Sequence, residues 1–326
     1  MNPSSLTILS ARDGISIKSR AKFLYQANFQ MPKAKKEEFT NTFMLGGHQA
    51  LRTNLVKGLH AVGIEFELSN QIPLHESNIG LLAGKELLRE LTRERKTQIG
   101  HLVVGPNLFI TPKGFETELQ NKRVKQIVVP SQWVADLWAR EAPEVIDKIV
   151  VWPVGIDFNY WQPQKLKQEK LRNKVIIYVK SQDEMIIDQV KAVLEKLEFL
   201  VVVITYGLYS EVRYQEELRG SAALVYIGSS ESQGIALLEA WAMDVPTFVY
   251  DSKKAVIIKS ESGLIYLEGS SYSPAPYLTV DRGRFWSDVN ELESHLGDRE
   301  KFAPRKNSEM FSVENCAIEY VKLFES

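Results

Sequence analysis

Apolar residues gather in short runs along the first half of the chain, and stretches with the spacing of an amphipathic helix separate these runs. The runs predict strands and the stretches predict helices, because the two structures repeat their buried positions with different periods. Strands are expected over residues 22–29, 64–68, 99–105, 124–129 and 149–152, and helices over 49–61, 84–95 and 132–140. This alternation favours an α/β fold in which helices cover both faces of a parallel sheet.

The alternation restarts after a break at residues 153–163, which are rich in turn-forming residues. Strands are then expected over 174–179, 199–205 and 222–227, and helices over 184–197, 211–218 and 313–324. We therefore expect two Rossmann-like, doubly wound domains at residues 1–155 and 156–326, with a last helix that packs back on the first domain. Ligands bind beyond the carboxyl ends of the strands in such sheets, so the cleft between the domains is the expected site.

The composition narrows the class of protein. Hydrophobic residues make up 44% of the 326 residues, and 40 basic residues nearly balance 41 acidic ones, for a formal net charge of -1. A general nucleic-acid binder needs a basic excess, so we expect no nucleic-acid partner. The single cysteine, Cys316, excludes an internal disulfide. No apolar run has the length of a membrane span, and the first residues lack a signal-peptide core, so we expect a cytoplasmic protein.

Candidate chemistry gathers in the stretch VYIGSSESQGIALLEAWAMDVPTFVYD. A strand ends before the loop that holds Glu231, which is where α/β folds place ligands. Gly234 lets the backbone approach a ligand closely, and a helix begins there. The free amides of Gly234, Ile235 and Ala236 therefore suit an anion such as phosphate.

Glu239 lies one turn further on, inside a helix that is otherwise apolar. A buried carboxylate needs a partner, and two hydroxyls of a sugar ring can supply one. Each glutamate taken alone also fits a plainer role: Glu239 can pair with a protein cation or face solvent, and Glu231 can be a plain surface residue of a polar loop. Their spacing around a helix start favours a shared ligand.

The segment SSESQGIALLEAWAMDVPTFVYD resembles the donor site of retaining glycosyltransferases with the GT-B fold. Their signature is a glutamate, seven residues, a second glutamate and a small-residue helix. The resemblance implies that Glu231 contacts hydroxyls of the donor sugar and that Glu239 binds the ribose of the nucleotide. It also implies that the amides of residues 234–236 meet the donor sugar and phosphates, and that the Gly46-Gly47 loop approaches these phosphates from the first domain.

Some positions depart from the family pattern. The family usually carries an Arg and a Lys, five residues apart, that hold the diphosphate, whereas this chain has Lys180 and Met185 at those places. Lysine cannot form the paired hydrogen bonds that the guanidinium of arginine makes to a phosphate. The diphosphate is therefore bound more weakly, or another residue such as Arg213 contributes to its binding. A family histidine near the reacting sugar has no clear counterpart, because His101 stands at the wrong end of its strand. Asn107, at the carboxyl end, is the better candidate.

From the resemblance we expect a hexosyltransferase that uses a nucleotide diphosphate sugar, retains the anomeric configuration, and needs no metal or cofactor. The acceptor stays open among a polysaccharide, a lipid-linked glycan and a small glycan. The helix expected near residues 84–96 can offer a basic face to a membrane, although its acidic residues fit a solvated helix. The alternatives are a sugar-nucleotide epimerase or phosphorylase-like enzyme and a non-catalytic GT-B module that binds a partner or a sugar nucleotide. The presence of Lys180 and Met185 in place of the family's Arg and Lys favours the non-catalytic module.

Overall fold

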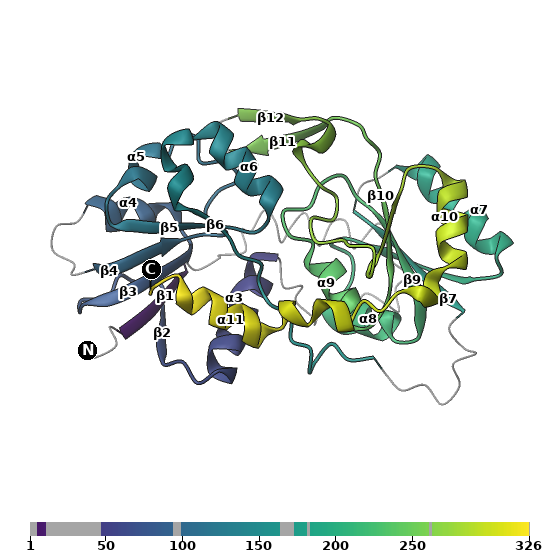
Figure 1. Ribbon diagram of the computed structural model, residues 1–326, viewed down its shortest axis with the longest axis horizontal. Helices are drawn as coiled ribbons and strands as arrows, with labels where there is room; N and C mark the ends of the chain where they lie inside the picture. Colours follow the sequence, from purple (N-terminus) through teal and green to yellow (C-terminus); the bar gives the residue numbers. More distant parts are fainter. Residues whose placement is uncertain are drawn as a thin grey trace.

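Two parallel β-sheets lie side by side in the molecule, each with helices on its two faces (Figure 1). The computed structural model describes residues 5–10, 47–93, 99–163, 173–180, 183–260 and 263–325. The expected strand over residues 22–29 and the first glycine of the pair, Gly46, lie outside these ranges. Within them, no helix is both long and apolar enough to cross a lipid bilayer.

The first sheet has six parallel strands in the order β2-β1-β3-β4-β5-β6. Its strands are β1 (Ser5–Ser10), β2 (Phe66–Ser69), β3 (Ser77–Ala83), β4 (Ile99–Val104), β5 (Val124–Val129) and β6 (Ile149–Val151). Its helices are α3 (Gly47–Ala61), α4 (Lys85–Arg93), α5 (Glu116–Gln120) and α6 (Gln132–Glu141), followed by the 3-10 helix η1 (Pro143–Lys148). The structure confirms the predicted elements in this half that it describes, to within two residues at each end. It adds β1, β3 and α5, which the sequence pattern did not predict.

The strands of this sheet supply two cores, because successive side chains point to opposite faces. In β4, Leu102 and Val104 enter the core that α4, α5 and α6 cover, whereas Val103 enters the core that α3 covers. The continuous apolar runs of the sequence follow from this two-sided burial.

The second sheet has five parallel strands in the order β13-β10-β9-β7-β8. The strands are β7 (Lys174–Val179), β8 (Leu200–Thr205), β9 (Ser221–Ile227), β10 (Thr247–Tyr250) and β13 (Gly283–Trp286). The helices are α7 (Glu184–Lys196), α8 (Glu211–Leu218), α9 (Ile235–Ala242) and α10 (Val289–Gly297). One core lies beneath α8 and α9 and the other beneath α7 and α10. The predicted strand 174–179 and helix 211–218 match β7 and α8 at both ends.

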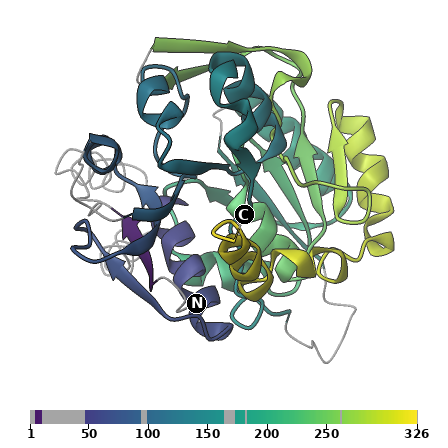
Figure 2. The ribbon, with the colours of Figure 1, turned by 60° about the vertical axis from the view of Figure 1, so that its left-hand side comes forward.

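Two later segments of the chain return to the first sheet. The hairpin of β11 (Val256–Ser260) and β12 (Gly263–Leu267) places Leu267 in the core beneath α6, with Ile258 and Ile265 packed against it. The last helix, α11 (Val313–Lys322), lies along α3, and its residues Ala317 and Tyr320 share a core with Leu55 and Leu59 (Figures 1 and 2). The two sheets are therefore joined by packing as well as by the chain.

The packing of α11 on α3 depends on a glycine. A Cβ atom at Gly58 would fall well inside the contact distance of the Val313 carbonyl oxygen. We expect Gly58→Ala to lose about 1–3 kcal/mol of unfolding free energy in denaturant titrations, because the backbone of α11 must move away. Gly297→Ala is the matched control, since a Cβ there meets no atom within 4 Å. Equal stability of the two variants would show that α11 tolerates the shift.

Candidate active site

A cleft of about 600 Å³ lies between the two halves of the molecule. On one side it is lined by the loop after β4 and by helix α6, and on the other by the loops after β7, β8 and β9. These loops follow the carboxyl ends of parallel strands, which is the edge where open α/β sheets bind ligands.

Glu231 lies in the loop after β9 and is bound by two side chains of the second half. Its Oε1 atom lies 2.5 Å from Nζ of Lys180, and the Tyr226 hydroxyl donates a hydrogen bond to the same oxygen. The side chains of Lys180 and Glu231 are 31% and 11% exposed. Burial, and then the negative charge of Glu231, raise the pKa of Tyr226 well above its usual value, so this phenol keeps the proton it donates. Glu231 is therefore not a plain surface residue of a polar loop.

The sheet register brings this pair together. Strands β7 and β9 are neighbours, and Val179 pairs with Ile227 at their carboxyl ends. The amide of Lys180 donates to the Ile227 carbonyl at 2.8 Å, so the two strands end side by side at the same edge of the sheet. Lys180 also lies over the ring of Tyr206, with Nζ 4.9 Å from its centroid. A carboxylate and an aromatic face thus hold the ammonium on two sides.

The first half of the molecule fixes the backbone of the Glu231 loop. Trp133 of α6 donates its indole N–H to the Glu231 carbonyl at 2.7 Å, and Gln233 donates to the Val154 carbonyl at 2.9 Å. On the other side, the Glu231 amide donates to the Ser273 carbonyl at 2.9 Å. The position of the loop therefore depends on the contact between the two halves.

Helix α9 begins at Ile235, and the residue that caps it, Gly234, adopts the left-handed conformation with φ of 81°. An L-residue with a side chain rarely adopts this conformation, so glycine is required at this helix start. In the described part of the chain, the amides of Gly234, Ile235 and Ala236 donate to no protein acceptor, and all three residues line the cleft. The positive end of the helix dipole thus opens into the cleft.

Glu239 also lines the cleft, and it has neither of the ordinary partners of a buried carboxylate. Among the described residues, no ion pair or hydrogen bond involves its carboxyl group, although the residue is half-buried. Burial, and then the negative charge of Glu211, raise its pKa well above 4.5. Its helix holds the polar group where only a ligand or water can satisfy it.

Five tyrosines of the described chain line the cleft, and all of them except Tyr206 are buried. The hydroxyls of Tyr178 and Tyr209 are 2.7 Å apart, and Tyr214 donates to the Ala236 carbonyl at 2.8 Å. Burial raises the pKa of all four buried phenols, Tyr226 included, so they are neutral. Apart from tyrosines, the ionisable side chains among the described lining residues are therefore Lys180 and the glutamates 211, 231 and 239.

The structure brings most of the predicted site residues together. Asn107 follows β4 and lines the cleft opposite Glu231, and Gly47 opens α3, whose residues Ala50 and Leu51 line the same cleft. His101 lies in the first half of β4, away from the carboxyl end, as its position in the sequence predicted.

The second basic position of the family pattern has no cation among the described lining residues of the cleft. Met185 lies in α7 with 67% of its surface exposed, and it does not line the cleft. Arg213 was a candidate to replace the missing cation, but it is not among the residues that line the cleft either. Lys180 is thus the one cation of the described cleft wall.

Three aromatic residues of the site, Trp133, Tyr206 and Tyr226, were not predicted from the sequence. Tyr226 stands inside an apolar strand, where an aromatic residue is normally part of the core. Trp133 belongs to the segment VVPSQWVADLW, and its place near the start of a helix at the carboxyl edge of the sheet was the signal that could have identified it.

No protein-family model and no curated protein sequence matches the chain. Solved structures match it by shape. HepE from Anabaena, in a crystal structure with UDP and glucose, has a TM-score of 0.53 and 12% identity, over 99% of each chain. A glycosyltransferase from Rickettsia africae has a TM-score of 0.50 and 11% identity, over 100% of this chain and 98% of that one.

A mutant of TarM from S. aureus, crystallised with fondaparinux, alpha-GlcNAc-glycerol and UDP, has a TM-score of 0.52 and 13% identity. The match covers 76% of this chain and only 55% of TarM. At such low identity the likeness establishes the fold alone. The chain has the GT-B fold of glycosyltransferases, with two Rossmann-like sheets facing a cleft.

The first prediction for this site concerns the contact between Tyr226 and Glu231. We expect Glu231→Ala to lose about 1–3 kcal/mol of unfolding free energy, because the buried Tyr226 hydroxyl is left without an acceptor. Adding Tyr226→Phe to Glu231→Ala should recover part of this loss. Denaturant titrations of the two single variants and the double variant measure the coupling. Strictly additive losses would contradict the described contact.

The second prediction concerns the proton of Glu239. The native protein holds this proton to a higher pH than the unfolded chain does, so unfolding free energy falls as pH rises from about 4.5 through the native pKa. We expect Glu239→Gln to raise the melting temperature relative to the wild type at about pH 8 and to raise it much less at about pH 4. Calorimetry at both pH values tests this. A difference that does not change with pH would show that the carboxyl group is not destabilised by burial.

Proposed function

We propose that the cleft binds a nucleotide diphosphate sugar and that the protein transfers its hexose to an acceptor with retention of configuration. One observation carries the proposal: an unpaired glutamate, a helix start with free amides and a second glutamate line one wall of a cleft in a GT-B fold. Each group suits a different part of such a donor. Fold likeness supports the class of reaction, whereas the substrate is argued from the site.

In this proposal the donor replaces the ion pair between Lys180 and Glu231 with its own contacts to both residues. The diphosphate takes the ammonium of Lys180 and the amides of Gly234–Ala236, and the sugar hydroxyls take the carboxylate of Glu231. The two protein groups stay close to the positions they hold without ligand, because Tyr226 and Tyr206 keep contact with them. A site arranged before binding loses less conformational entropy when the ligand enters.

Glu239 binds the ribose in the same proposal. Two ribose hydroxyls donate to the carboxylate, and they favour its ionised form. Binding of the nucleotide therefore favours loss of a proton from Glu239, whose pKa is raised by burial. The nearby Glu211 raises the cost of that ionised form, so the affinity for nucleotide should increase with pH through the raised pKa.

Transfer breaks the bond between the anomeric carbon and the phosphate oxygen, the acceptor oxygen bonds to the same face of that carbon, and the proton of the acceptor hydroxyl passes to the leaving phosphate oxygen. Negative charge develops on the leaving diphosphate, where the amides at the start of α9 and Lys180 stabilise it. Asn107 faces this point from the other half of the cleft and orients the acceptor hydroxyl. The two halves of the cleft hold the donor and the acceptor in the relative orientation that transfer requires.

A non-catalytic module that binds a sugar nucleotide is the second candidate. The observation that favours it is the charge of the cleft, because three glutamates and one lysine are the charged residues of its described wall. A diphosphate carries negative charge into this acidic site. The module would bind the donor and release no nucleoside diphosphate with any acceptor.

A thermal-shift screen against UDP-, GDP-, ADP- and CMP-linked sugars identifies the donor, since a bound ligand raises the melting temperature. With the matching nucleotide, we expect Lys180→Ala to weaken binding of the diphosphate by about 10–100-fold and to leave the nucleoside nearly unchanged, because only phosphate contacts are lost. Lys191→Ala is the matched control, since Lys191 lies on α7 outside the cleft. Calorimetric titration of diphosphate and nucleoside with each variant gives the two affinities.

Two results would contradict parts of this proposal. Equal diphosphate affinity in the Lys180→Ala and Lys191→Ala variants removes Lys180 from the phosphate site. Donor binding without release of nucleoside diphosphate, across a panel of glycan and glycoside acceptors, decides for the non-catalytic module.

A further inference from the structure

The two walls of the cleft differ in chemistry. All of its described charged side chains come from the second half of the molecule. Every described lining residue from the first half is apolar except Asn107, and Ile258 of the hairpin continues this apolar wall. The wall consists mainly of the loop after β4 and one face of α6.

The side-chain N–H groups of the two tryptophans in this wall are already hydrogen-bonded. Trp133 donates its indole N–H to the Glu231 carbonyl at 2.7 Å, and Trp138 donates to the Ile110 carbonyl at 3.1 Å. A ligand therefore meets ring faces and aliphatic carbon, with the Asn107 side-chain amide as the polar side chain of the described wall. A glycan chain or phosphate lying here would lose hydrogen bonds to water without replacement.

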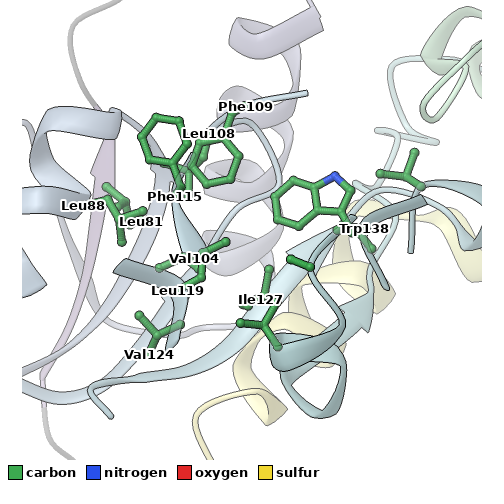
Figure 3. Close-up of a cluster of buried hydrophobic side chains, with 14 of the residues drawn as sticks. Leu81, Leu88, Val104, Leu108, Phe109, Phe115, Leu119, Val124, Ile127 and Trp138 are labelled. Atoms are coloured by element: carbon green, nitrogen blue, oxygen red, sulfur yellow. The ribbon is translucent and has the colours of Figure 1, made fainter. Parts of the chain in front are cut away.

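The wall is also rigid. Phe109 stacks on Phe115 at 4.3 Å between ring centroids and on Trp138 at 5.3 Å, and these rings belong to the core beneath α6 (Figure 3). Ile110 stands next to this stack with 44% of its surface exposed, and Trp133 is half-buried. The apolar surface that faces the cleft is thus supported by close-packed core residues behind it.

We propose that this wall binds the apolar aglycone, alkyl or aryl, of a glycoside acceptor. The aglycone covers Ile110, Trp133 and Ile258, and the sugar of the acceptor extends toward Asn107 and the donor. This inference rests on the proposed function, because it assigns the donor to the opposite wall. It names the acceptor as an amphipathic glycoside rather than a free sugar or a charged polysaccharide.

The test compares methyl, n-octyl and p-nitrophenyl β-D-glucopyranoside as probes, below the critical micelle concentration of the octyl compound. Calorimetric titration of the whole protein gives each affinity, and UDP, GDP, ADP and CMP are titrated in parallel. We expect the octyl or the nitrophenyl glycoside to bind at least about tenfold more tightly than the methyl glycoside. A preference for octyl indicates a lipid-like aglycone, and a preference for nitrophenyl indicates an aromatic one.

Ile110→Ser should reduce this preference by about threefold or more and leave nucleotide affinity unchanged. Ile146→Ser is the matched control, because Ile146 is 52% exposed on η1 and does not line the cleft. Equal affinities for the three glucosides, no binding of any of them, or equal effects of the two serine variants would overturn the inference. Failure of every nucleotide to bind, with the glucoside preference intact, would instead overturn the donor proposal.

Discussion

A carboxylate at the end of a buried strand has to be neutralised, and the arrangement of the cleft depends on how this chain neutralises Glu231. Lys180 supplies the opposite charge and Tyr226 supplies a proton donor, from the ends of two neighbouring strands. The backbone on either side of the carboxylate is then fixed by Trp133 and Ser273. Trp133 belongs to the first half of the molecule and Ser273 to the second. The position of the Glu231 carboxylate therefore depends on the contact between the two halves.

The second glutamate meets the same requirement in another way. Glu239 has no cation beside it among the described residues, and the charge that acts on its carboxyl group is the like charge of Glu211. Its protonated form is therefore favoured. The two glutamates of the motif thus lie in different surroundings: Lys180 and Tyr226 bind the carboxyl group of Glu231, whereas burial raises the pKa of Glu239. Sequence spacing alone cannot distinguish these surroundings.

Much of the second sheet could be predicted from the sequence, because its buried strands are unbroken apolar runs between clear turn signals. β7 and α8 have the predicted ends. The strands β3 and β13 were missed because Asn78, Gly80 and Arg284 interrupt their apolar pattern. β13 and the hairpin fall in the looser tail of the pattern, where alternation is weak.

Only those site residues that lie close together in the sequence could be predicted to share a site. Glu231, Gly234 and Glu239 lie within one loop and one helix, so their shared position follows from the strand-to-helix pattern. The pairing of Lys180 with Glu231 spans 51 residues and depends on the register of β7 against β9. Trp133 reaches the loop from the other half of the chain, 98 residues away in sequence. Such contacts arise from the order of the strands, which the sequence pattern leaves open.

The position of α11 has a consequence for the synthesis of the protein. Leu51, Leu55 and Leu59 of α3 share their core with Ala317 and Tyr320, which follow the whole second sheet in the chain. While the residues between the two helices are being translated, the apolar face of α3 has no cover from α11. The first sheet therefore completes its core only after the second sheet has been made, and until then the apolar face of α3 favours aggregation of the nascent chain.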